Sequence, residues 1–168
     1  MQLLYQKTLS PQLLTEQVTP AAGAWSRLLH AHALITRELN AELRSTHGLT
    51  ISEFEVLLLL GRAPQHSLRR IDLANQVMLS PSGITRMLNR LGSEGLVENS
   101  KCDVDARVTY AVLTDAGAEK VRAAFSVQLA AVERLFGDEL AVEEVETLAG
   151  LLGRLPGAEE SCDPDAGE

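Results

Sequence analysis

A chain of 168 residues can build one compact domain with a dimerisation appendage, but not two independent domains with separate cores. Few aromatic residues (4%) and many Leu, Ala, Glu and Arg residues favour helices over sheets. The sequence has neither an apolar run of about 20 residues that could span a membrane nor the layout of a signal peptide, which predicts a cytoplasmic protein. The net charge of −8 counts against nucleic-acid binding only if the acidic residues lie where the nucleic acid would bind.

Two helices are predicted in the N-terminal part of the chain. Ser10 and Pro11 form an N-cap followed by proline at the first helical position, which predicts a short helix up to Val18. From residue 21 to about residue 46, apolar residues recur close to the 3.6-residue helical period, and Gly48 supplies the end of this longer helix. The apolar positions of the longer helix are Trp25, Leu28, Leu29, His32, Ile35, Leu39 and Leu43.

The middle of the chain predicts two further helices. Residues 52–55, SEFE, have the spacing of a capping box, in which the serine hydroxyl and a glutamate carboxylate each accept a hydrogen bond from an amide of the first turn. Residues 56–60 are wholly apolar, which predicts a helix that is buried on most sides and forms the spine of the core. After a loop, residues 68–78 predict a shorter helix. Its inward residues are expected to be Ile71, Ala74 and Val77.

The next predicted elements are a helix and a β-hairpin. Ser80 and Pro81 repeat the signal of an N-cap followed by proline, and the helix that they begin is expected to end near Gly92. Residues 96–101 and 108–113 are strand-like segments, and they flank the polar sequence CDVDAR. This order of strand, polar turn and strand predicts a hairpin.

The C-terminal part predicts two helices and a tail. Thr114 and Asp115 cap a long helix that Gly137 closes, and the leucines up to Leu155 predict a last helix. From residue 156 the sequence is polar and acidic, which predicts a disordered tail.

The predicted helix after Ser80 has an apolar face and a polar face. The apolar residues Ile84, Met87, Leu88 and Leu91 form a stripe directed to the core, and a polar row lies about 200° around the helix. Arginine can bond bidentately to guanine and asparagine to adenine, while small hydroxyl residues let a helix approach the major groove closely. The alternative is an ordinary face that meets only water. The polar row consists of Ser82, Thr85, Arg86 and Asn89.

Cations gather in the part of the chain where this DNA contact is predicted. Residues 62–110 contain seven Lys and Arg residues against five carboxylates, whereas residues 138–168 contain ten carboxylates and one arginine. DNA affinity depends on cations that face phosphates, and a distant acidic surface opposes it only through screened repulsion. The acidic total therefore does not exclude DNA binding.

Residues 73–117, LANQVMLSPSGITRMLNRLGSEGLVENSKCDVDARVTYAVLTDAG, resemble the winged-helix signature of the MarR family of transcription regulators. The resemblance implies a recognition helix within residues 80–93 and a wing over residues 97–112, where Asp105 and Arg107 form an acid-and-arginine pair whose arginine enters the minor groove. Ala106 stands where many members carry an arginine, which removes one possible phosphate contact. The predicted DNA-contacting residues are Ser82, Thr85, Arg86, Asn89, Arg90, Lys101, Asp105 and Arg107.

The resemblance also implies a fold and an assembly. The expected fold is mainly α with a small β-hairpin wing, a winged helix-turn-helix whose N- and C-terminal helices form a dimerisation region. A homodimer would set its recognition helices roughly 34 Å apart, which fits a pseudo-palindromic operator in double-stranded DNA. The resemblance also implies that the regulator is a repressor. The expected parts are residues 1–48 and 114–155 for dimerisation, residues 49–113 for the DNA-binding lobe and residues 156–168 for the tail.

Members of the family bind small anionic aromatic molecules, so the resemblance implies a phenolic or other aromatic acid that releases the DNA. Trp25, Arg27, His30 and His32 supply a flat apolar surface, a partner for a carboxylate and hydrogen-bond donors for such a ligand. The alternative is that Trp25 and His32 are core residues of the long helix.

The sequence contains fewer signals for other functions. Cys102 stands beside Lys101 in the predicted wing, which leaves an oxidant-sensing regulator open, and a winged helix that contacts only proteins is a further alternative. The sequence lacks the motifs of serine hydrolases, P-loop proteins, zinc proteases and dinucleotide-binding enzymes, and its four histidines are scattered. Cys102 and Cys162 do not have the spacing of metal ligands. We therefore expect no enzymatic activity, no metal and no cofactor.

Overall fold

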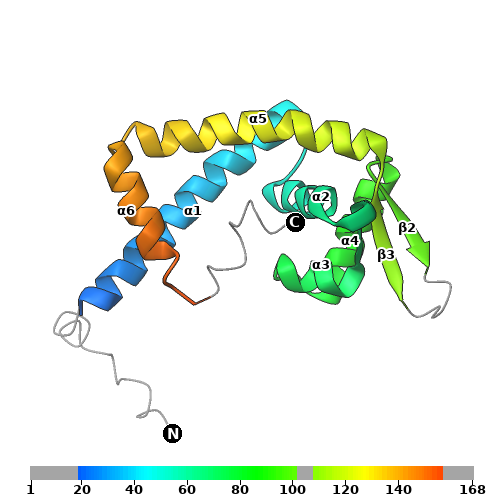
Figure 1. Ribbon diagram of the computed structural model, residues 1–168, viewed down its shortest axis with the longest axis horizontal. Helices are drawn as coiled ribbons and strands as arrows, with labels where there is room; N and C mark the ends of the chain where they lie inside the picture. The colour runs from blue at the N-terminus through cyan, green and yellow to red at the C-terminus, as the bar shows by residue number, and fades with distance from the viewer. Residues whose placement is uncertain (1–18, 102–107, 157–168) are drawn as a thin grey trace, which may run out of the picture. The chain divides into compact units, whose positions relative to one another are not determined.

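The computed structural model describes residues 19–101 and 108–156, and these residues are mainly helical with a small antiparallel sheet, which confirms the predicted fold class (Figure 1). The chain falls into two compact units, one that ends at Glu38 and one that begins at Leu39. The elements in chain order are α1 (Pro20–His47), α2 (Ile51–Arg62), the 3₁₀ turn η2 (Pro64–His66), β1 (Ser67–Arg69), α3 (Arg70–Gln76), α4 (Pro81–Ser93), β2 (Val97–Lys101), β3 (Thr109–Leu113), α5 (Asp115–Gly137) and α6 (Val142–Leu152).

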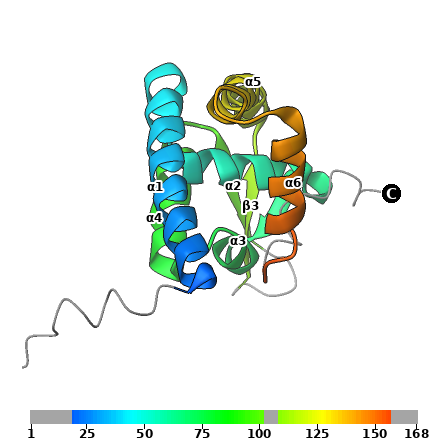
Figure 2. The same ribbon diagram turned by 90° about the vertical axis from the view of Figure 1, so that its left-hand side faces the viewer.

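Helix α2 is the spine of the core. Its Val56, Leu57 and Leu60 are fully buried, and they belong to one apolar cluster with residues of α4 and α5. Figure 2 looks along α5 and shows α2 crossing beneath it. This burial confirms the prediction from the apolar run, and each aliphatic side chain of this kind contributes about 1.5–3 kcal/mol to folding.

The N-cap of α2 is Thr50 rather than Ser52, so the predicted capping box was wrong by two residues. Thr50 Oγ1 accepts from the Glu53 amide at 3.2 Å, and the Glu53 carboxylate accepts from the Thr50 amide at 2.8 Å. Both serine and threonine precede a glutamate by three residues here, so the motif alone fits either start. The earlier start is supported by Asn40, whose Oδ1 accepts from the Ile51 amide at 3.1 Å.

The helix predicted from residue 68 begins later, because its first residues form a strand. Ser67–Arg69 pairs antiparallel with β3 and makes the order of the sheet β1-β3-β2. Ile71, predicted to face inward, is 54% exposed, whereas Leu73 and Ala74 are buried. The free edge of β3 offers backbone hydrogen bonds that a hairpin alone would leave unpaired. Pairing along this edge delays the start of the helix. Of the three residues predicted to face inward, Ala74 is buried and Val77 packs against the core, so only the prediction for Ile71 was wrong.

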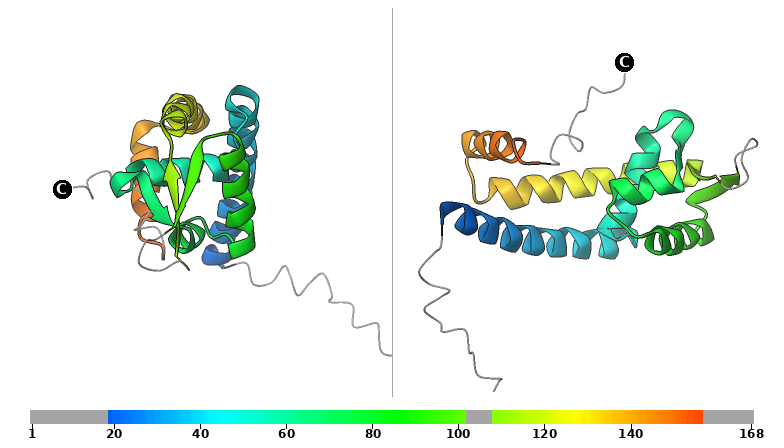
Figure 3. Two further views of the ribbon diagram at one scale, coloured as in Figure 1. Left: turned by 90° about the vertical axis from the view of Figure 1, so that its right-hand side faces the viewer. Right: turned by 90° about the horizontal axis from the view of Figure 1, so that it is seen from below.

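The second strand of the wing leads directly into α5 (Figure 3). The N-cap of α5 is Thr114, as predicted. Thr114 Oγ1 accepts from the Gly117 amide at 3.0 Å and donates to the Gly95 carbonyl at 2.7 Å, and the Thr114 amide donates to the Leu96 carbonyl at 3.2 Å. A Cβ atom on Gly117 would lie 2.2 Å from the Leu96 carbonyl oxygen. Only glycine therefore lets α5 begin this close to the base of the wing.

Helix α1 ends at the predicted position. Gly48 has a φ of +68°, in the left-handed region that favours glycine, and its amide donates to the Arg44 carbonyl at 3.0 Å. The predicted helix before Val18, the turn CDVDAR at residues 102–107 and the tail from residue 157 lie outside the described residues.

Candidate nucleic-acid interface

Helix α4 carries its polar row outward and its apolar stripe inward. The side chains of Ile84, Leu88 and Leu91 are buried in the core cluster, and Met87 is half-buried against it. The sequence period therefore predicted correctly which face of the helix anchors it. The polar row consists of the exposed Ser82, Arg86 and Asn89 and the half-buried Thr85.

The first turn of α4 is capped by its own hydroxyl groups. Ser80 Oγ accepts from the Gly83 amide at 3.1 Å, and it lies 3.2 Å from Ser82 Oγ. Thr85 Oγ1 donates to the Pro81 carbonyl at 2.8 Å, so its proton is used within the helix. The oxygen of Thr85 remains an acceptor, which suits an amino group on a base edge.

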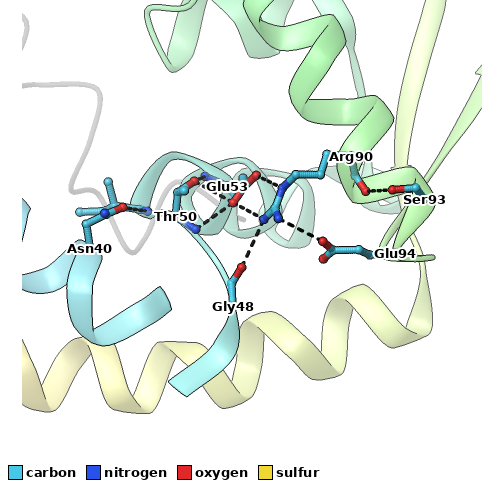
Figure 4. Close-up of polar contacts among 8 residues, drawn as sticks. Asn40, Gly48, Thr50, Glu53, Arg90, Ser93 and Glu94 are labelled. Atoms are coloured by element: carbon cyan, nitrogen blue, oxygen red, sulfur yellow. Dashed lines mark hydrogen bonds and ion pairs between the residues drawn. The ribbon is translucent and has the colours of Figure 1, made fainter. Parts of the chain in front are cut away.

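Arg90, a predicted DNA contact, is held by groups of the protein (Figure 4). Its Nε and Nη2 atoms donate to the two carboxylate oxygens of Glu53, and Nη2 also donates to the Gly48 carbonyl at 3.2 Å. Its Nη1 atom lies 3.1 Å from Oε1 of Glu94. These partners come from the start of α2, the end of α1 and the end of α4, and sequence spacing gave no signal of the pair with Glu53.

Among the described residues, Glu53 is the one charged side chain that is buried, with 5% of its surface exposed. Its carboxylate accepts from the amide and the hydroxyl of Thr50, each at 2.8 Å, as well as from Arg90. Burial raises the pKa of Glu53, but the hydrogen bonds from Arg90 and Thr50 and the charge of Arg90 outweigh it, so the pKa lies below its ordinary value of 4.5. The carboxylate is therefore ionised at neutral pH.

The wing is described along its strands and not at its tip. Strands β2 and β3 pair in register from Val97 opposite Leu113 to Lys101 opposite Thr109, which confirms the predicted hairpin. The side chain of Lys101 and residues 102–107, which include Cys102, Asp105 and Arg107, lie outside the described part of the chain. The sheet places the ends of the strands that carry this tip next to each other.

The four predicted ligand residues lie on one stretch of α1. Trp25 is 60% exposed, and Arg27, His30 and His32 are exposed as well. Nδ1 of His30 lies 2.9 Å from the Ser26 carbonyl oxygen. The alternative that Trp25 and His32 are core residues is therefore wrong within a single protomer.

An apolar hollow of about 770 Å³ lies between α5 and α6. Its lining is almost entirely aliphatic and aromatic, and none of the four predicted ligand residues contributes to it. The sequence predicted that these two helices take part in dimerisation, but not that they enclose a hollow. The apolar side chains of the lining are Val132, Phe136, Leu140, Val142, Val145, Leu148, Ala149 and Leu152.

In residues 19–101 and 108–156, no three His, Cys, Asp or Glu side chains gather as metal ligands would. Within the same ranges, every helix is too short or too polar to cross a bilayer.

Comparisons with known proteins agree on one family. The model of the MarR family matches residues 49–109. AbsC, a MarR family transcriptional regulator from Streptomyces coelicolor, has a similar structure with a TM-score of 0.72 and 32% sequence identity, over 82% of this chain and 93% of that one. A cysteine-to-serine mutant of MarR from Escherichia coli, complexed with operator DNA, gives a TM-score of 0.67 and 29% identity, over 76% and 89%. An HTH-type transcriptional regulator from Bacillus cereus is 30% identical over 131 residues, which are 78% of this chain and 85% of the relative.

Replacement of Glu53 by Gln is expected to lower the free energy of unfolding by about 1–3 kcal/mol at neutral pH, because Arg90 loses a charged partner. The folded-state pKa of Glu53 is depressed, so the stabilisation is fully present above pH 4.5 and is lost as pH falls through the folded-state pKa. Urea unfolding from roughly pH 7 to pH 3, at one protein concentration, measures the difference between wild type and Glu53→Gln.

The difference in stability should be constant down to about pH 4.5 and shrink below it. Glu119→Gln, which removes an exposed carboxylate from α5, is the control and should stay close to wild type throughout. A gap between Glu53→Gln and wild type that persists unchanged at the acid end would contradict the assignment of the ion pair.

Proposed function

The chain belongs to the MarR family of winged-helix transcriptional regulators, which bind DNA, and we propose that it is a repressor that binds a pseudo-palindromic operator as a homodimer. The observation that carries the proposal is the outward polar row of α4, seated by three buried apolar side chains. Operator DNA bound to the related MarR of Escherichia coli supports the same class of partner for this chain.

The proposed reading element is α4 in the major groove. Arg86 would bond to guanine and Asn89 to adenine, and the short side chains of Ser82 and Thr85 would let the first turns approach the bases. The N-terminal amides of α4 add a favourable position for a phosphate. Arg90 is not among the proposed contacts, because its donors are bound to Glu53 and Gly48.

The proposed second element is the tip of the wing. By resemblance to the family, Arg107 would enter the minor groove, where a narrow A·T tract concentrates negative potential, and Asp105 would orient its guanidinium. Lys101, at the end of β2, would lie beside the phosphates. The described pairing of β2 with β3 supports a rigid carrier for this tip.

The proposed homodimer would bury apolar side chains that no described residue of the protomer covers. Phe125 and Leu129 on α5, Leu151 on α6 and Leu155 after the end of α6 are each more than 40% exposed, and the hollow between these helices is apolar. Exposed apolar side chains that gather on neighbouring helices in this way are typical of an interaction site. A second copy is the proposed occupant, because a two-fold interface is self-complementary and would set two α4 helices for successive major grooves.

The proposed signal is a small phenolic or other aromatic acid that releases the operator. Trp25 offers an exposed aromatic face on α1, Arg27 offers a charge for a carboxylate, and His30 and His32 offer ring nitrogens. A ligand that binds only the DNA-free form shifts the equilibrium away from the operator complex by its difference in affinity.

Arg86→Ala is expected to weaken operator binding by about 1–3 kcal/mol and to relax base preference at one position, because a bidentate contact is lost. Arg107→Ala is expected to weaken binding with little change in fold. The probe is a duplex selected from a random pool by the wild-type protein, with affinities measured by fluorescence anisotropy at one salt concentration. Arg154→Ala, which removes a charge after α6, is the control. Unchanged affinity in both test variants would reject the assignment of the two elements.

Leu151→Glu is expected to weaken self-association more than about tenfold, since a charge would be buried at the proposed dimer contact. Leu151 is 54% exposed in the protomer, so the substitution should leave the protomer folded. Sedimentation should show wild type at twice the chain mass of 18.2 kDa and the variant at one chain mass. Gln76→Glu adds the same charge to the end of α3 and should remain a dimer. A monomeric wild type would remove the dimer from the proposal.

A benzoate-type acid is expected to raise the melting temperature of the wild type in a concentration-dependent way, because a ligand that binds the folded state stabilises it. The shift should be lost in Arg27→Ala, which lacks the proposed partner of the carboxylate, and retained in Arg37→Ala, an exposed arginine further along α1. A panel of phenolic acids that shifts neither melting temperature nor operator affinity would leave the ligand proposal without support.

A further inference from the structure

Arg90 has few donors left for a nucleic acid. Its Nε and Nη2 atoms are bonded to Glu53 and Gly48, and Nη1 lies next to Glu94 (Figure 4). Two carboxylates therefore flank one guanidinium, which makes the local charge negative. A phosphate would be repelled by the carboxylates as well as attracted by the arginine.

A contact between Arg90 and DNA would also leave the Glu53 carboxylate without its charged partner. That carboxylate is 5% exposed, and without Arg90 its remaining donors among the described residues are the amide and the hydroxyl of Thr50. Arg90 is 43% exposed, but its partner is buried, so loss of the arginine would leave the buried Glu53 carboxylate with an uncompensated charge. The protein therefore favours the arrangement in which Arg90 stays on Glu53.

The apolar seat of α4 fixes which face of the helix is buried, and directional contacts refine its rotation about the axis. Contacts of Ile84, Leu88 and Leu91 with the core are apolar and hence less directional than a hydrogen bond. A rotation of about 10° moves side-chain tips that lie about 6 Å from the helix axis by roughly 1 Å, whereas a binding site tolerates about 0.5 Å. A bidentate arginine–carboxylate pair has defined geometry and supplies this finer constraint.

We infer that Arg90 is a positioning residue, whose bidentate pair with Glu53 sets the rotation of α4 and thereby the base preference of the polar row, without touching DNA. Arg86 precedes Arg90 by four residues, about one helical turn, so a change of rotation at Arg90 displaces the side chain proposed to read guanine. The inference rests on the proposed function, because it assumes that α4 reads bases.

The experiment compares wild type, Arg90→Gln, Glu53→Gln and the double variant on two duplexes. One duplex is selected from a random pool by the wild-type protein, and the other is its shuffled sequence. Each single variant is expected to lose at least about tenfold in affinity for the selected duplex and to change less than about twofold on the shuffled one. The double variant should lose no more affinity for the selected duplex than either single variant, because the two residues act as one unit.

The dependence of affinity on salt separates positioning from a phosphate contact. For a positioning residue, the slope of log affinity against log salt concentration should stay as in wild type, whereas loss of a phosphate contact reduces it by about 0.9. Arg90→Lys keeps the charge without the bidentate geometry, so it should show the same loss of preference even if a Gln variant is poorly folded. Arg134→Gln, which breaks the ion pair of Arg134 with Glu42 (3.0 Å) on α1, is the matched control and should keep full preference.

A reduced salt slope in Arg90→Gln, with equal losses on both duplexes, would overturn the inference and make Arg90 a phosphate contact. Wild-type base preference in a folded Glu53→Gln or Arg90→Lys would overturn it as well. If the wild-type protein itself selects no sequence, the proposed function fails instead, and the role of Arg90 would then be limited to stability.

Discussion

The seating of α4 on the apolar surface around α2 is the constraint on which the DNA-binding half depends. Leu57 and Leu60 of α2 and Leu88 and Leu91 of α4 are fully buried in one cluster, so the two helices have little freedom to separate. That burial leaves the other side of α4 to polar residues. The polar row faces outward because the apolar stripe on the opposite side of α4 is buried. The position of the wing relative to α4 is fixed as well, because Gly95 and Thr114 connect α4, β2 and α5 within a few residues.

Local signals in the sequence were sufficient to predict most of the helices and strands. The N-caps Ser80 and Thr114, the end of α1 at Gly48 and the helical period of α4 all act within a few residues, and each was predicted where the structure has it. Ser52 is the instructive failure, since a second residue with the same capping chemistry stands two positions earlier. The choice of Thr50 was decided by a contact from α1, which a local motif does not contain.

Features that depend on distant partners could not be predicted in the same way. Three residues of β1 are too few to show a period, and they form a strand because β3 has an edge to pair with. Arg90 looked like another cation on the reading helix, yet its partner Glu53 is 37 residues away in the sequence. The exposure of Trp25 and His32 could not be predicted for the same reason. The period of α1 shows which residues share a face of the helix, but not whether another part of the protein covers that face.

Ion pairs take up some of the cations of the DNA-binding lobe. Among the cations of the described DNA-binding lobe, Arg69 is paired with Asp72, and Arg90 lies between Glu53 and Glu94, so neither offers a full charge to phosphate. Arg86, in contrast, has no ion pair with any described carboxylate. Phosphate contacts contribute affinity without sequence preference, whereas base contacts contribute preference. Under the proposed function, a lobe whose Arg69 and Arg90 are paired with its own carboxylates would depend on the geometry of α4 more than on its net charge for its preference among DNA sequences.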